Sequence, residues 1–462
     1  MAEKRVLLLN PPNPRLCIRD YYHSKTSKTN YLFPPIELVV LSGILSTRHE
    51  VDVLDAIADR MPDEKCLEKI AKKGYDAIVT LMGDVSFGHD VYFLQQVRAR
   101  TRAPLFAMGD CLLETPEQRL RELPFLDGIL LDFTNQDIVR FLGGDRDQLH
   151  CMAYRDGEKT VESIAPWGEK EFEIPVPRHE LFTSRSYRFP LVRNPRFTTM
   201  LTDYGCRFKC TFCVSGTLGH KQRPAGNVIQ EMKHVYSLGI REIFFEDNTF
   251  RSNKLDNRKL CEAMIEADLG MGWVCFSRVD VVDETTLALM KRAGCHTIIF
   301  GVESAAPEIL KRYRKGYTLE KVRTTFQLCR KLGIRTVGTF LFGLPEDTWE
   351  TCRKTINLAV ELDCDYASFN MAVPRAHTGL REIALQEGLV SADLRNMDQS
   401  GAEICMPTRH LTIEQLKRIK RNFVTRFYLR PSYFLKRLRG IGNFYELREN
   451  LSEALALFRG IL

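Results

Sequence analysis

The first 145 residues alternate short apolar runs with helical patterns. The apolar runs are RVLLLN, HEVDVLDA, YDAIVTLMG and APLFAMGD, and the segment IELVVLSGIL repeats its apolar positions as a helix does. Strands that alternate with helices predict a parallel, doubly wound sheet for residues 1–145. Such sheets bind ligands at the loops that follow their strands. The predicted ligand-binding residues of these loops are Asn10, Pro11, Gly83, Asp84, Ser86, Gly109 and Asp110.

The periodicity fades between residues 146 and 195, where Pro, Arg and aromatic residues dominate and predict an extended linker. A second alternation follows over residues 196–390. Its six strand candidates are FTTMLT, EIFFED, WVCFS, HTIIFGVE, RTVGTFLFG and YASFN. Six strand–helix units are too few for the usual eight-unit TIM barrel, so they predict an open, partial barrel with its chemistry on the loops after the strands. Residues 391–462 are charged and helical in pattern.

Composition narrows the class of protein. The chain has 462 residues, of which 44% are hydrophobic and 27% charged, as is typical of a globular protein with two or three domains. A formal net charge of +7 is small for this length, so we expect a solvated surface and no nucleic-acid partner. The start of the chain lacks the apolar region of a signal peptide, and no apolar run is long enough to span a bilayer. Because its fourteen cysteines are scattered, the chain is expected to be cytoplasmic with reduced thiols.

Three cysteines fall within eight positions on the loop after the first strand of the second alternation: Cys206, Cys210 and Cys213. A structural zinc site uses four ligands, and a disulfide framework needs an even number of cysteines. Three thiolates on one strand-to-helix loop suit a 4Fe-4S cluster in which one iron is left to a ligand that is not protein. Chance clustering and half of a zinc site are the alternatives, since short patterns produce false positives.

The spacing Cys-x3-Cys-x2-Cys, with an aromatic residue before the last cysteine, resembles the signature of the radical S-adenosylmethionine (SAM) enzymes. In that family the amino and carboxylate groups of SAM chelate the fourth iron. The resemblance continues in order along the chain through FFEDNTF, SRVD, FGVES, FLFGLPEDT and RAHTGL. The last of these differs from the family pattern in the order of His and Thr.

The resemblance also implies which residues bind the cofactor. They are Phe212, Glu246, Asp247, Arg278, Glu303, Ser304, Gly343 and Pro345. The acid at 246 or 247 would accept hydrogen bonds from the SAM ammonium, and Arg278 offers a fork for the carboxylate. Glu303 and Ser304 would bind the ribose or the carboxylate, and the Gly–Pro loop would lie along the adenine. For each acid, a helix cap or a surface ion pair is the alternative.

The implied reaction is the reductive cleavage of SAM. One electron, supplied by an external reductant such as flavodoxin or ferredoxin, breaks a carbon–sulfur bond and yields the 5′-deoxyadenosyl radical. This radical removes a hydrogen atom from an unreactive carbon of the substrate. The protein must hold that carbon close and keep water out. The resemblance assigns no catalytic side chain.

The N-terminal segment resembles the cobalamin-binding class of these enzymes through LLLNPPNP, YLFPPIELVVLSGIL, HEVDVLDAIAD and ETPEQRL. The likeness covers nearly the whole chain and implies that the strand-end loops hold cobalamin and that methylcobalamin methylates an unactivated carbon. Radical cyclisation or rearrangement, with or without cobalamin, is the alternative, because MGDC and LLDFTNQD replace glycine-rich loops of the family. The chain has no Asp-x-His-x-x-Gly sequence, so we expect no protein ligand to cobalt and expect His49 and His89 to be surface residues.

Two other classes of protein share part of this pattern. A transfer RNA methylthiotransferase would need three further cluster cysteines, for which Cys17, Cys66 and Cys111 are the candidates. Cys66 lies in the helical pattern DEKCLEKIAKK and is expected to face a core. A non-catalytic iron–sulfur protein would normally satisfy all four irons with cysteine.

The segment RIKRNFVTRFYLRPSYFLKRLRGIGNF, residues 418–444, interleaves basic and aromatic residues. A helical cap whose aromatic residues pack on the barrel is the favoured interpretation. Contact with a membrane surface, or with a long apolar substrate, is the alternative. Related proteins with similar ends act on lipids and tetrapyrroles, so we expect a small-molecule substrate of apolar, lipid-like character.

Overall fold

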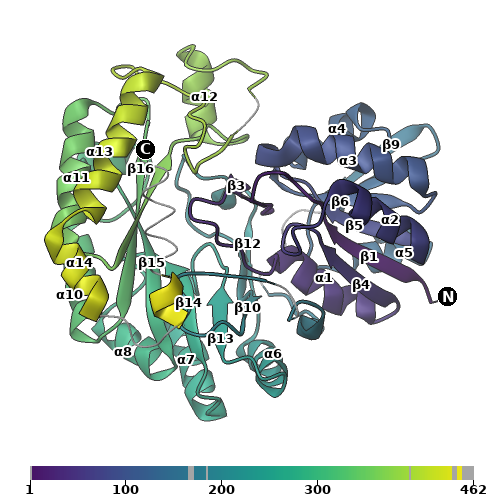
Figure 1. Ribbon diagram of the computed structural model, residues 1–462, viewed down its shortest axis with the longest axis horizontal. Helices are drawn as coiled ribbons and strands as arrows, with labels where there is room; N and C mark the ends of the chain where they lie inside the picture. The colour runs from purple at the N-terminus through teal and green to yellow at the C-terminus, as the bar shows by residue number, and fades with distance from the viewer. Residues whose placement is uncertain (1–2, 165–170, 184–185, 395–396, 440–444, 450–462) are drawn as a thin grey trace. The chain divides into compact units, whose positions relative to one another are not determined.

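The computed structural model describes residues 3–164, 171–183, 186–394, 397–439 and 445–449 (Figure 1). It divides the chain into two compact units. The first comprises residues 1–27 and 32–187, and the second comprises residues 28–31 and 188–462. Each unit has its own sheet and its own hydrophobic core.

The first unit contains a seven-stranded sheet in the order β4–β1–β5–β6–β7–β8–β9. Its strands are β1 (Arg5–Asn10), β4 (Glu50–Asp55), β5 (Ala77–Leu81), β6 (Leu105–Met108), β7 (Gly128–Leu130), β8 (Cys151–Asp156) and β9 (Lys159–Ile164). The first five are parallel, and their order is that of a doubly wound sheet whose switch point lies between β1 and β5. β1 and β5 are buried along almost their whole length, as central parallel strands are. The doubly wound fold predicted for this region is confirmed.

Helices connect these strands. They are α1 (Ile36–Ser46), α2 (Asp63–Lys73), α3 (Phe87–Arg100), α4 (Pro116–Glu122) and α5 (Asp137–Leu142), with the short pair β2 (Cys17–Ile18) and β3 (Lys25–Thr26) after β1. α1 is almost wholly buried, which explains its continuous apolar sequence.

The region predicted as an extended linker differs from that prediction in its first part. β8 and β9 form an antiparallel hairpin that extends the sheet beyond β7. Its two-residue turn is Gly157–Glu158, and Gly157 adopts a positive φ of 61°. A glycine at the first position of a two-residue turn is a hairpin signal that the loss of helical periodicity obscured.

The second unit contains six parallel strands in sequential order: β10 (Phe197–Met200), β13 (Glu242–Phe245), β14 (Gly272–Ser277), β15 (Cys295–Glu303), β16 (Arg335–Phe342) and β17 (Tyr366–Met371). The intervening helices are α6 (Ala225–Ser237), α7 (Lys254–Ala267), α8 (Glu284–Arg292), α9 (Pro307–Arg312), α10 (Leu319–Lys331) and α11 (Trp349–Leu362). In Figure 1 they run from teal to green around the sheet. The predicted open barrel of six strands is confirmed.

Side-chain caps explain where several of these helices begin. Asn253, Asp283, Thr318 and Thr348 each accept a hydrogen bond from a backbone N–H in the first turn of the helix that follows. Such caps stabilise a helix start by about 1 kcal/mol. They fix the lengths of the loops between strand ends and helices, which are the loops that carry the candidate site.

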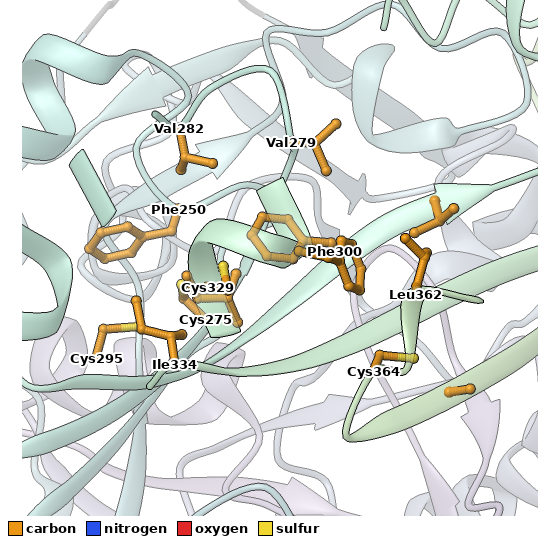
Figure 2. Packing of buried hydrophobic residues seen from close by; sticks show 14 of the residues in the cluster. Phe250, Cys275, Val279, Val282, Cys295, Phe300, Cys329, Ile334, Leu362 and Cys364 are labelled. Carbon is orange, nitrogen blue, oxygen red and sulfur yellow. The ribbon is translucent and has the colours of Figure 1, made fainter. Parts of the chain in front are cut away.

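Figure 2 shows part of the barrel core, with Cys275, Cys295, Cys329 and Cys364 packed among apolar side chains. All four are buried, with exposed fractions of 1% or less. Burial raises the pKa of Cys329 and Cys364, which keeps these thiols protonated at neutral pH. These cysteines are therefore core residues.

The C-terminal region adds α12 (Gly379–Gln386), α13 (Ile413–Tyr428) and α14 (Pro431–Arg439). Phe423 on α13 packs against Phe342 and Phe369 of the barrel, with ring centroids 4.0 and 5.3 Å away. Phe427 of the same helix is also buried. The favoured interpretation of this segment as a helical cap is confirmed for residues 418–439, and residues 440–444 of the quoted segment lie outside the described residues. In the described parts of the chain, no helix combines the length and apolar character that crossing a membrane requires.

Candidate active site

The three-cysteine loop is held at its two ends by a small hairpin. β11 (Asp203–Gly205) pairs with β12 (His220–Gln222), and the N–H of Cys206 donates to the carbonyl of Gly219 at 3.0 Å. Gly205 has φ 70°, and a Cβ there would lie 2.1 Å from the Gly219 carbonyl oxygen. Only glycine fits this close approach in this conformation. The glycine therefore sets the start of the cysteine loop.

The middle of the loop is fixed by neighbouring segments of the same unit. The N–H of Thr211 donates to the carbonyl of Tyr313 at 3.2 Å, and the carbonyl of Thr211 accepts from the N–H of Leu380 at 2.9 Å. Leu380 lies in the first turn of α12, within the predicted RAHTGL motif. The motif that closes the barrel thus contacts the backbone between Cys210 and Cys213.

Each cysteine of the loop has hydrogen-bonding neighbours. Cys206 is within reach of the Thr249 hydroxyl, Cys213 is within reach of the Ser215 hydroxyl, and Cys210 accepts from Nη1 of Arg278 at 3.3 Å. Burial, and then the nearby Cys213, raise the pKa of the Cys206 thiol to about 11. Binding of metal must therefore displace protons from these thiols.

The donor set fits a cluster better than a mononuclear metal. Among the residues that the structure describes, no three His, Cys, Asp or Glu side chains are gathered closely enough for one ion. In a 4Fe-4S cluster each cysteine binds a different iron, so the thiolates lie further apart than the ligands of one zinc ion. Three thiols on one tightly held loop therefore favour a cluster over a single zinc ion.

The two adjacent acids after β13 have different surroundings. Asp247 is fully buried, and it accepts hydrogen bonds from the N–H groups of Thr202 and Asp203 at 2.6 and 2.8 Å. Burial, and then the charge of Asp203, raise the pKa of Asp247 to about 7. Glu246 is partly exposed, and its N–H continues the pairing of β13 with β10. Asp247 therefore ties the end of β10 to the end of β13, whereas Glu246 reaches the carboxyl edge of the sheet.

The predicted residues at the end of β15 also separate into two kinds. Glu303 adopts a positive φ of 64° and pairs with the buried Lys315 at 2.7 Å. Ser304 is 1% exposed and accepts from the N–H of Ala306 at 3.1 Å, so it caps the turn before α9. Lys315 was not predicted. Its only signal in the sequence is a lysine in the short KGYT loop between two helical patterns.

The loop after β16 is held by Asp347. This carboxylate accepts from the N–H groups of Gly343 and Leu344 at 3.0 and 3.1 Å, and burial raises its pKa to about 7. Gly343 has φ 83°, a conformation that favours glycine. The carbonyl of Pro345 accepts from the N–H of Arg409 at 3.0 Å. The loop is thus a fixed turn at the carboxyl end of the barrel.

The aromatic residue of the cysteine motif contacts the segment that follows α9. The ring of Phe212 packs 6.1 Å from that of Tyr313, and the Lys315 ammonium lies 5.5 Å from the Phe212 ring centroid. The loop and the segment after α9 therefore meet through side chains as well as backbone.

In the first unit, the predicted strand-end residues gather around a buried ion pair. Arg19 contacts Asp90 at 2.6 Å, and both side chains are fully buried. Arg19 also donates to Asn10 and to the carbonyl of Pro11, each at 2.8 Å. Asp90 accepts from the N–H of Gly83 at 3.0 Å. The loops after β1 and β5 are therefore joined at the switch point of the sheet.

A second group joins the loop after β6 to this edge. Asp110 accepts from the N–H groups of Ser24 and Asp84 at 2.8 and 2.9 Å. Gly109 has φ 145°, and a Cβ there would lie 1.7 Å from the carbonyl oxygen of Met82. Asp110 therefore joins the loops after β1, β5 and β6, and Ser86 donates to Asp90 of the buried ion pair at 2.6 Å. Doubly wound sheets bind ligands at this strand-end edge.

The other residues weighed from the sequence lie in the core of this unit or near its surface. Cys17, Cys66 and Cys111 are buried, and Cys66 faces the core as predicted. The prediction that His49 is a surface residue is wrong, because its ring is 6% exposed behind the end of α1, where burial lowers its pKa. His89 is partly exposed and lies 3.1 Å from Asp63.

Comparison with known proteins gives a family. Residues 200–359 match the model of the radical SAM superfamily. The chain is 30% identical over 416 residues to the uncharacterized methyltransferase PH0819 of Pyrococcus horikoshii, covering 87% of this chain and 89% of that protein. It is 26% identical over 384 residues to the anaerobic magnesium-protoporphyrin IX monomethyl ester cyclase of Rubrivivax gelatinosus, covering 78% of this chain and 68% of the relative.

Among solved structures, the methyltransferase TsrM from Kitasatospora setae, with cobalamin and a 4Fe-4S cluster bound, superposes with a TM-score of 0.70 at 18% identity over 100% of both chains. This likeness concerns the fold, which comprises both units. The chain belongs to the radical SAM superfamily, and it is an enzyme of that superfamily with the two-unit fold found in TsrM.

Proposed function

We propose that this enzyme methylates an unactivated carbon of a small molecule, using a 4Fe-4S cluster, SAM and cobalamin. The observation that carries the proposal is the joining, in one chain, of a three-cysteine loop on an open barrel to a doubly wound unit whose strand-end loops meet at its switch point. When bound, the cluster supplies the electron that cleaves SAM, and cobalamin carries the methyl group.

The residues of the barrel would bind and orient SAM. Cys206, Cys210 and Cys213 would hold the cluster. Glu246 is the acid that we assign to the SAM ammonium, because Asp247 is already engaged by backbone N–H groups. The fixed turn around Gly343 would support the adenine.

The names of the relatives support methylation first and cyclisation second. PH0819 carries a methyltransferase name, and TsrM is a methyltransferase whose structure contains cobalamin. The cyclase of Rubrivivax gelatinosus supports radical cyclisation as the second candidate, since it aligns with more than three quarters of this chain. The two reactions differ in products, because methylation consumes the SAM methyl group and leaves S-adenosylhomocysteine.

We do not extend the proposal to a lipid-like substrate or to a membrane. The aromatic residues that suggested them, such as Phe423 and Phe427, are used in packing α13 on the barrel. An external one-electron reductant is required for the cleavage of SAM, and flavodoxin and ferredoxin are the candidates. All fourteen cysteines are free thiols, which suits a reducing compartment such as the cytoplasm.

The experiment is product analysis with the anaerobically reconstituted protein, reductant and SAM. We expect 5′-deoxyadenosine, and we expect S-adenosylhomocysteine only when cobalamin is present. The variant Cys206→Ala/Cys210→Ala/Cys213→Ala should lose iron and both products, whereas the control Cys151→Ala/Cys405→Ala, which alters two partly exposed thiols elsewhere, should retain them. Iron retained by the triple variant, or 5′-deoxyadenosine formed without iron, would refute the assignment.

A further inference from the structure

Arg278 has surroundings that differ from those expected of a carboxylate-binding fork. It follows β14, is 6% exposed, and makes four hydrogen bonds in the second unit. Nε and Nη2 donate to the two oxygens of Asp280 at 3.0 and 2.8 Å. Nη2 also donates to the carbonyl of Lys315 at 2.5 Å, and Nη1 donates to Sγ of Cys210 at 3.3 Å.

These contacts leave no edge of the guanidinium open for a bidentate partner. A guanidinium has five N–H donors in a fixed fork and binds a carboxylate through two neighbouring N–H groups. Asp280 takes the Nε–Nη2 edge, and the carbonyl of Lys315 and the sulfur of Cys210 take the Nη1–Nη2 edge. The rings of Phe208 and Tyr317 lie 3.8 and 5.4 Å from the guanidinium carbon.

The contact with Cys210 distinguishes this cysteine from the other two. Cys206 and Cys213 have neutral hydroxyl neighbours in Thr249 and Ser215, and the charge of Lys315 also acts on Cys213. Cys210 has a cation, and Asp280 lies at the opposite edge of that cation from the sulfur. The second cation nearby, Lys315, is paired with Glu303 at 2.7 Å, so its charge is largely offset. The sulfur of Cys210 therefore faces the positive side of the Arg278–Asp280 pair.

We infer that Arg278 is a positioning residue for the cluster, which orients Cys210 and raises the reduction potential of the cluster bound there, and that it does not serve as the fork for the SAM carboxylate. Reduction adds one electron to the cluster, so a positive charge bonded to a ligand sulfur stabilises the reduced form more than the oxidised form. Hydrogen bonds to the sulfurs and the surrounding charge are the means by which proteins set such potentials. This inference rests on the proposed cluster site.

The test is an anaerobic redox titration of the reconstituted protein without SAM, followed by electron paramagnetic resonance. In Arg278→Gln the ratio of reduced to oxidised cluster at a fixed potential should fall about tenfold, which for a one-electron couple is a shift of about 59 mV to more negative potential. Arg278→Lys, which keeps the charge but loses the planar fork, should shift less. The affinity for SAM, measured separately by equilibrium dialysis, should stay within about threefold of the parent.

Two further variants make the result unambiguous. Asp280→Asn leaves the bond between Arg278 and Cys210 in place but removes the countercharge, so its potential should rise. It decides the question if Arg278→Gln fails to hold iron. The control is Arg258→Gln. Arg258 lies on α7, and its guanidinium pairs with Asp283 at 2.9 Å away from the three cluster cysteines, so this variant should leave the potential unchanged.

An unchanged potential in both Arg278→Gln and Asp280→Asn overturns the inference. So does an unchanged potential in Arg278→Gln with a loss of SAM affinity of tenfold or more, which would restore the carboxylate role. Failure of the parent protein to bind a cluster would refute the proposed function instead, so the two failures are distinguishable.

Discussion

Replacing Gly205 with alanine adds a methyl group where the cysteine loop leaves no room. The new Cβ would lie 2.1 Å from the Gly219 carbonyl oxygen, and φ of 70° is unfavourable for alanine. The left-handed conformation costs about 1–2 kcal/mol. Relief of the clash separates the two strands and breaks the bond from the N–H of Cys206 to Gly219, which costs about 1–3 kcal/mol more. We expect the free energy of unfolding to fall by about 2–5 kcal/mol. The distortion should be greatest at Cys206, the first cluster cysteine, so iron binding should fall as well.

The assay measures iron and sulfide content after anaerobic reconstitution, together with denaturant unfolding of the apoprotein. Gly226→Ala is the matched control, because Gly226 lies in the first turn of α6 and an added Cβ would meet nothing within 4 Å. It should be neutral or stabilise the protein by up to about 1 kcal/mol. A Gly205→Ala protein with full iron content and the stability of the parent would refute the reasoning about this loop.

Two further predictions concern the cap and the N-terminal unit. Phe423→Ala should destabilise the protein by about 3–5 kcal/mol, because it removes a ring that packs against Phe342 and Phe369. The control Phe434→Ala, at a residue that is 44% exposed, should change the stability little. Equal effects of the two variants in denaturant unfolding would contradict the packing of α13. Burial, and then a neighbouring carboxylate, raise the pKa of Glu37 to about 8 from 4.5. The stability contributed by its protonated form is therefore complete below about pH 4.5 and is lost as the pH rises through about 8. The melting temperature of Glu37→Gln minus that of the parent should therefore increase between pH 5 and pH 8.5. Parallel melting curves across this range would show that Glu37 does not titrate there.

The sequence was sufficient for the central parallel strands and for the cysteine loop. The central strands are apolar runs bounded by turn residues, and they appear in the structure where periodicity placed them. The cysteine loop could be found because three thiols at this spacing carry chemistry in themselves. Both patterns are local in the sequence, so reading them does not require knowledge of tertiary contacts.

The sequence was insufficient where a role depends on a distant partner. Glu246 and Asp247 are adjacent and chemically alike, and only the structure shows that the backbone N–H groups of Thr202 and Asp203 donate to Asp247. From the sequence, Arg278 is a guanidinium suited to binding a carboxylate. Its hydrogen bonds to Cys210 and Asp280 can be seen only in the structure. His49 follows α1 in a polar stretch, and its burial comes from tertiary packing.

The hairpin of β8 and β9 was missed for a related reason. Its two strands are only partly buried, so their alternation is weak beside the prolines and arginines that follow. What fixes them is the pairing of β8 with β7, which is a contact between segments about twenty residues apart.

The most direct test of the proposed function is the cobalamin content of the native enzyme. The protein should be expressed with cobalamin uptake supported, purified without oxygen and passed through gel filtration before its visible and electron paramagnetic resonance spectra are recorded. The proposal predicts stoichiometric corrinoid whose reduced cobalt signal shows no nitrogen splitting, because the sequence has no Asp-x-His-x-x-Gly motif to supply a histidine to the metal. Absence of corrinoid after supplementation would contradict a cobalamin-dependent methylase.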